Sequence, residues 1–139
     1  MLFFVSVPAM MELARFHLLV GWTSMVAGAL SGAGIGLFFH DERWMGGYAS
    51  LRRRMLRLGH ISFFGLGILN VLFALSIAAA PIEAAYARFA SYGFAAAVVA
   101  MPTCCFLTAW RARFRLWFPV PVAAVLVGLA SLIGGWLRT

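Results

Sequence analysis

Few residues of this 139-residue chain could carry out chemistry, and most of them lie inside long apolar stretches. His17 lies in the first stretch, and His60 and Asn70 lie in the second. The adjacent Cys104 and Cys105 match no zinc-binding spacing, and neighbouring side chains on a helix point apart. We expect both cysteines to be small core hydrophobes and no metal to be bound, which leaves the histidines as the leading candidates to contact a cofactor.

The elements that must position these residues are membrane-spanning helices. The chain is 64% hydrophobic and 11% charged, whereas a soluble domain carries about 25% charge. A bilayer core needs roughly 20 apolar residues per spanning helix. The sequence therefore predicts an all-α integral membrane protein, a single up-down bundle over residues 1–139. The expected spans cover residues 13–39, 56–80, 84–109 and 116–137, with a cytoplasmic loop over residues 40–55.

The basic residues, all of them arginine, indicate the orientation of the spans. Most of them lie in the loop over residues 40–55 with the start of the second span, or in the turn over residues 110–117, and these arginine-rich connections are expected to face the cytoplasm. Both termini are then on the outer side of a bacterial inner membrane. Although the net charge is +7, the arginines gather at helix ends rather than on one exposed face, which argues against nucleic-acid binding.

The first eleven residues are apolar but lack a basic start and a small-residue cleavage site. We expect them to be retained as a lead-in at the membrane interface.

The histidines are expected at different depths. Counting from the cytoplasmic ends of the spans places His17 and His60 roughly 25 Å apart along the membrane normal. That separation excludes a haem held by both. His17 is expected at the outer interface, capped or with its polar tip directed to water; the alternative is that His17 or His60 contacts a haem b or quinone shared with a partner chain. His40 is expected in the loop beside Asp41.

The stretch "RFHLLVGW", residues 15–22, resembles the histidine-containing, Gly-Trp-containing spans of haem-copper-oxidase-type and nitric-oxide-response respiratory membrane proteins. The resemblance covers one helix of four. It implies a respiratory, energy-transducing setting for the chain.

The stretch "GALSGAGIG", residues 28–36, is unusually rich in glycine. It follows no strand and no lysine is present, so it is neither a dinucleotide fingerprint nor a phosphate-binding loop. On a helix, small residues recur every fourth position and form a packing face for another span, a second copy or a different subunit. The residues of this stripe are Ser24, Gly28, Gly32 and Gly36.

A second cluster lies where the second span enters the membrane. Guanidinium groups at that level attract anionic lipid. We expect a lipid or quinone headgroup site, or simple anchoring of the span, formed from Arg53, Arg54, Arg57, His60 and Trp44.

The sequence therefore favours a structural role. No nucleophile with its base, metal cage or phosphate cradle is apparent, so we expect no enzymatic activity and no cofactor. The favoured interpretation is an accessory subunit that packs against other integral membrane subunits of an energy-transducing complex and contacts anionic phospholipid. One alternative is a redox subunit that contributes a histidine to a haem b or quinone site. Another is a homo-oligomeric channel or lipid-handling protein, for which the expected polar lining is sparse.

Overall fold

The structure is a computed structural model that describes residues 7–138. These residues form no strands. Four of the helices are long and apolar enough to cross a membrane, the last of them together with the short helix before it, which confirms the expected helical class. In chain order the elements are α1 (Val7–Leu37), η1 (Trp44–Gly46), α2 (Leu51–Ala79), α3 (Ala84–Trp110), η2 (Ala112–Trp117) and α4 (Pro119–Trp136).

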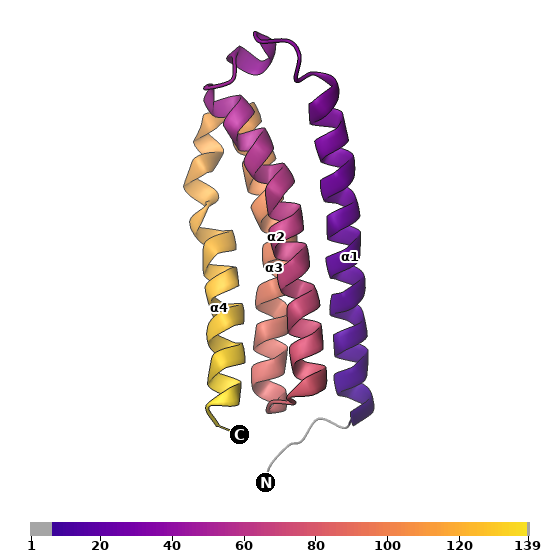
Figure 1. The fold of residues 1–139 in the computed structure, drawn as a ribbon. Helices are drawn as coiled ribbons and strands as arrows, with labels where there is room; N and C mark the ends of the chain where they lie inside the picture. Colours follow the sequence, from indigo (N-terminus) through magenta and orange to yellow (C-terminus); the bar gives the residue numbers. More distant parts are fainter. Residues whose placement is uncertain (1–6, 139) are drawn as a thin grey trace.

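The four long helices lie side by side, with α2 and α3 in the middle and α1 and α4 flanking them (Figure 1). The α1–α2 and α3–α4 connections lie at one end of the molecule, which we call the connection end. The α2–α3 connection, the start of α1 and the end of α4 lie at the opposite end (Figure 1). α1 packs mainly on α2, and α4 packs mainly on α3.

Two helices begin earlier than the sequence predicts. α1 begins at Val7 rather than near residue 13, so Pro8 occupies its first turn, where the missing N–H costs little. The expected interfacial lead-in is therefore helical from Val7, and residues 1–6 lie outside the described residues. α2 begins at Leu51 rather than near residue 56, because the Ser50 side chain caps it by accepting a hydrogen bond from the Arg53 backbone N–H.

Proline placement explains two further features. Pro119 opens α4. Pro102 lies inside α3 and removes one helical hydrogen bond there. The neighbouring Thr103 hydroxyl donates to the Val99 carbonyl at 2.7 Å.

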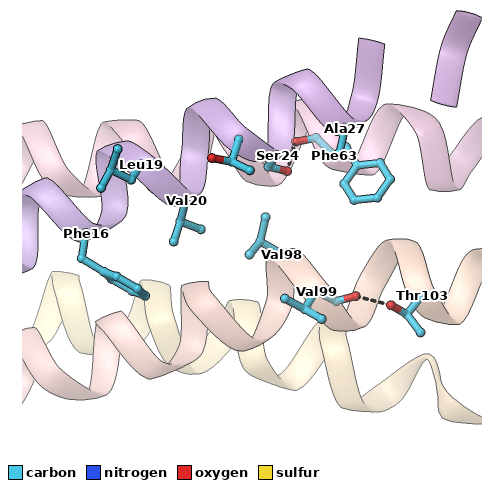
Figure 2. A pocket seen from close by; sticks show the side chains of 10 residues that line it. Phe16, Leu19, Val20, Ser24, Ala27, Phe63, Val98, Val99 and Thr103 are labelled. Atoms are coloured by element: carbon cyan, nitrogen blue, oxygen red, sulfur yellow. Dashed lines mark hydrogen bonds between the residues drawn. The ribbon is translucent and has the colours of Figure 1, made fainter. Parts of the chain in front are cut away.

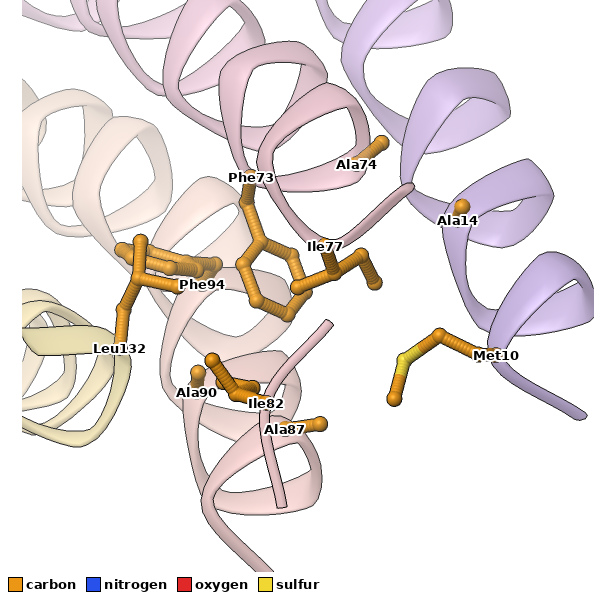
Figure 3. Close-up of a cluster of buried hydrophobic side chains, with 10 residues drawn as sticks. All are labelled: Met10, Ala14, Phe73, Ala74, Ile77, Ile82, Ala87, Ala90, Phe94 and Leu132. Atoms are coloured by element: carbon orange, nitrogen blue, oxygen red, sulfur yellow. The ribbon is translucent and has the colours of Figure 1, made fainter. Parts of the chain in front are cut away.

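The larger hydrophobic cluster lies toward the opposite end and joins all four helices (Figure 3). Phe73 of α2 and Phe94 of α3 meet at its centre, with ring centroids 5.1 Å apart. α3 presents alanines to this cluster, which lets its neighbours approach closely. The cluster consists of Met10, Ala14, Phe73, Ala74, Ile77, Ile82, Ala87, Ala90, Phe94 and Leu132.

Candidate functional site

A buried polar network joins three helices beside this cluster. His17 of α1 is fully buried; its Nδ1 lies 2.6 Å from Asn70 Oδ1 of α2, and its Nε2 lies 2.8 Å from Ser91 Oγ of α3. The Asn70 amide nitrogen donates to the Leu66 carbonyl at 2.8 Å and to the Phe94 carbonyl at 3.4 Å. Every polar atom of the His17 ring therefore has a partner within the chain.

These partners assign the proton on the imidazole. Because the Asn70 NH2 group faces two carbonyls, its Oδ1 must face His17, and an amide oxygen only accepts. His17 Nδ1 therefore carries the proton and donates it to Asn70. Nε2 of the neutral ring is then an acceptor, and Ser91 donates to it.

The position of His17 corrects the sequence-based expectation. His17 is neither capped at the outer interface nor directed to water, because α1 begins ten residues before it and carries it to the depth of Asn70 in the second half of α2. Asn70 is ten residues from His60, so the two histidines differ in depth by about 15 Å at 1.5 Å per residue, less than expected. They remain too far apart to share one haem iron.

The seam between α1 and α2 continues this pairing toward the connection end. A Cβ on Gly21 would lie 2.6 Å from the Gly67 carbonyl oxygen, so the two backbones are in contact there. One turn further on, the Ser24 hydroxyl donates to the Phe63 carbonyl at 2.7 Å. His60 Nδ1 then donates to the Gly28 carbonyl at 2.8 Å. Polar tethers and close backbone approach thus alternate along the seam.

The small-residue stripe packs against α2 of the same chain over most of its length. A Cβ on Gly28 would lie 2.7 Å from the Phe64 ring, and one on Gly32 would overlap the His60 ring. In contrast, a Cβ on Gly36 would meet nothing within 4 Å. The stripe therefore ends at Gly32 as a packing surface, and its partner is an internal helix.

His60 differs from His17 in one respect. Its Nδ1 must carry the proton, since the Gly28 carbonyl can only accept. Its Nε2 has no hydrogen bond among the contacts described for residues 7–138, and the residue is half-buried. His60 thus presents an oriented imidazole lone pair, the arrangement in which a backbone carbonyl holds a ligating histidine.

Arg53 does not lie where a headgroup could reach it. It is 2% exposed, and its guanidinium donates to the Phe39 and Asp41 carbonyls at 2.8 and 3.2 Å. The Trp44 and Tyr48 rings also lie within 6 Å of it. Arg53 therefore fastens the loop between α1 and α2 to the start of α2. This corrects its expected role in lipid or quinone binding, and Trp44 belongs to the same loop packing, stacked on Phe38.

The other arginines of this cluster are less enclosed than Arg53, although Arg57 is half-buried and its Nη1 has no hydrogen-bond partner among the described residues. Arg54 is exposed, and the Arg57 guanidinium lies 4.1 Å from the centre of the Tyr48 ring. Both remain candidates to contact an anionic headgroup. Such a contact would be made at the protein surface and not in an enclosed pocket.

An open groove runs between α1 and α3, with Phe63 of α2 also lining it (Figure 2). Its volume is about 540 Å³. The side chains that line it are overwhelmingly apolar and include Phe16, Leu19 and Val20 of α1, Phe63 of α2, and Val98 and Val99 of α3. This groove could not be predicted from the sequence, because it depends on how far α1 stands from α3.

Cys104 and Cys105 are free thiols and both are buried, as expected of core hydrophobes. Among residues 7–138 no three His, Cys, Asp or Glu side chains gather closely enough to hold a metal ion.

Ser91 is the member of the His17–Asn70 hydrogen-bond network that the sequence did not single out. The available signal was a polar side chain isolated in an alanine-rich span.

Comparison of the chain with protein-family models, with curated proteins and with solved structures gave no match.

Proposed function

We propose that this chain is a multi-pass accessory subunit that packs into a larger assembly in a bacterial inner membrane. The observation that carries the proposal is the internal use of its polar groups. His17, Asn70, Ser91 and Ser24 bind one another or backbone carbonyls, and among the described residues no cluster of side chains resembles a catalytic centre. The bundle exposes many large apolar side chains to its surroundings.

The outer faces of the flanking helices support this proposal. α1 exposes Leu19, Trp22 and Leu30, and α4 exposes Val120 and Leu126, each by 60% or more. Such faces suit either acyl chains or neighbouring helices. The energy-transducing setting rests on the resemblance of residues 15–22 to respiratory membrane proteins.

The orientation follows from charge. The connection end carries most of the arginines, including Arg52, Arg54, Arg111, Arg113 and Arg115, whereas the opposite end carries three: Arg15 in α1, Arg88 in α3 and Arg138 after α4. By the positive-inside rule the connection end faces the cytoplasm, and the start of α1 and the end of α4 face outward.

A native-membrane experiment tests the accessory role. The chain, tagged after α4, is solubilised gently and separated on a blue-native gel, and the other components of its band are quantified with and without the gene. We expect one discrete band well above 15.2 kDa, whose other subunits fall in abundance when the chain is deleted. Migration as a monomer or as copies of this chain alone would contradict the proposal.

Substituting the stripe is a poor test of partner binding, because Gly32 packs against His60 of the same chain. Tryptophan at an exposed position such as Leu126 is a better probe. It leaves the described internal contacts intact, so loss of the large complex together with an unchanged circular dichroism spectrum would locate a partner contact on α4.

A redox role is the second candidate, and His60 is the observation that favours it. Its Nε2 lone pair is unpaired within the described residues and oriented by the Gly28 carbonyl, whereas His17 could ligate iron only by giving up its hydrogen bond from Ser91. If a haem b is shared with a partner chain, the intact complex should show a Soret band that His60→Ala removes and His17→Ala leaves in place. A colourless complex would rule out the haem b.

A further inference from the structure

The groove between α1 and α3 has the chemistry of a hydrocarbon site. Three hydroxyls line it, those of Thr23, Ser24 and Thr103. Ser24 donates to the Phe63 carbonyl and Thr103 donates to the Val99 carbonyl (Figure 2). Two of the three hydroxyl donors are therefore engaged by backbone carbonyls of the chain itself, and the remaining lining is apolar apart from Thr23. A volume of about 540 Å³ lies within the range of pockets that hold small molecules, roughly 300–1,000 Å³.

The helical register extends the groove toward the connection end. Residues seven or eleven apart share a helix face. Trp110 therefore lies on the same face of α3 as Thr103 and Val99, nearer the connection end. Gly34 likewise lies on the same face of α1 as Ala27, nearer the connection end. A Cβ on Gly34 would meet nothing within 4 Å, so this side of α1 is open. At the upper end of the α3 face the Arg111 guanidinium lies 5.2 Å from the centre of the Trp110 ring.

We propose that the α1–α3 groove binds one acyl chain of an anionic phospholipid whose phosphate contacts Arg111 at the connection end. The exposed Trp110 ring marks the headgroup level, as aromatic residues do at membrane interfaces. Eleven residues separate Trp110 from Val99, about 16 Å at 1.5 Å per residue. An acyl chain spans half of a roughly 30 Å hydrocarbon core, so a chain that starts at Trp110 ends near Val99.

Charge complementarity favours an anionic headgroup. The connection end holds the arginines of both connections and of the first turns of α2, against only Asp41 and Glu42. The lining favours an acyl chain over a helix of another protein, because interfaces between membrane helices are enriched in small residues. In this molecule Gly21, Gly28 and Gly32 of α1 face α2, and no glycine is among the described residues that line the groove, most of which are phenylalanine, leucine and valine.

Native mass spectrometry tests the site. The chain is reconstituted with equal amounts of phosphatidylglycerol and phosphatidylcholine carrying identical acyl chains, and the lipid retained on release is counted. We expect one retained lipid, with phosphatidylglycerol favoured about fivefold, the attraction expected of one arginine near an anionic surface. Arg111→Gln should bring the ratio close to one.

Two substitutions should block the groove without opening the core. Val99 is 65% exposed at the rim, and Ala27 lines the opposite wall, so Val99→Trp and Ala27→Trp should each abolish retention of either lipid. The matched control is Val127→Trp on α4, 48% exposed and outside the groove, which should retain lipid as the unmodified chain does. Circular dichroism checks that each variant is folded.

Three results would overturn the proposal: equal retention of the two lipids by the unmodified chain, equal retention by the groove variants and the Val127→Trp control, or cross-linking of a photoreactive residue at position 103 to a polypeptide instead of a lipid. The site does not depend on the accessory role, since a chain that forms no complex would still retain the lipid.

Discussion

The two outer helices are attached in different ways. α1 meets α2 through hydrogen bonds as well as glycines: His17 to Asn70, Ser24 to the Phe63 carbonyl, and His60 to the Gly28 carbonyl. α4 meets α3 through close apolar packing, in which a Cβ on Gly93 would lie 2.6 Å from the Ala124 carbonyl and one on Gly128 would lie 2.7 Å from the Phe94 ring.

The two kinds of contact constrain the position of a helix differently. Packing of glycine against backbone gains dispersion wherever two helices fit, but a hydrogen bond between particular residues fixes the register and rotation of a helix. The polar tethers hold α1 at one rotation on α2, and this rotation turns Phe16, Val20 and Ala27 toward the groove. The α3–α4 contact needs only a close fit.

The largest expected effect is at the points where glycine meets backbone. Gly21→Leu and Gly93→Leu should each lower the free energy of unfolding by about 3 kcal/mol, since neither the Gly67 nor the Ala124 backbone can move aside cheaply. Unfolding in detergent micelles by added dodecyl sulfate, followed by circular dichroism, measures this. Gly34→Leu, which meets open space on the same helix, is the control. An equal loss in the control would mean that helix propensity, not contact, sets the cost.

The polar network should show a smaller, coupled effect. His17→Ala and Asn70→Ala should each cost about 2 kcal/mol, because each leaves a buried polar partner unsatisfied. In a double-mutant cycle the coupling should be about 1 kcal/mol, within the range of up to about 1.7 kcal/mol measured for hydrogen bonds between membrane helices. Additive losses would show that the two side chains do not depend on each other and would remove the distinction drawn between the two attachments.

The smallest effect is expected at Ser24. Ser24→Ala removes one hydrogen bond to the Phe63 carbonyl and should cost about 0.6 kcal/mol in the same unfolding assay. Ser62→Ala is the matched control, because the Ser62 hydroxyl donates to Gly59 within its own helix and should change the stability less. If Ser62→Ala costs more, the hydroxyls contribute through their own helices and not through the seam.

Much of the fold could be predicted because the hydrophobic signal is local. Long runs of apolar residues predicted four helices, and the structure has them, with boundaries altered at Val7 and Leu51 by the permissive first turn at Pro8 and the cap at Ser50. The small-residue stripe was also visible, but its partner was not, because a glycine face can pack against any helix that fits.

The candidate sites were less predictable. His17, His60 and Asn70 could be singled out, since polar groups are rare in apolar spans. Their pairing could not be predicted, because a small error in where α1 begins displaced His17 to the membrane interface. Arg53 shows the same limit: in sequence it is one of several arginines, and only the folded loop makes it the buried one.

The sequence by itself determined that this chain forms apolar helices, with charge concentrated at one end, because hydropathy and charge belong to each residue wherever it is placed. The tertiary structure alone decided that His17 is enclosed by Asn70 and Ser91, that Gly28 and Gly32 of the stripe pack on α2, and that α1 stands away from α3 to leave a groove. These features depend on the relative rotation and separation of helices, which are set by contacts between residues distant in sequence.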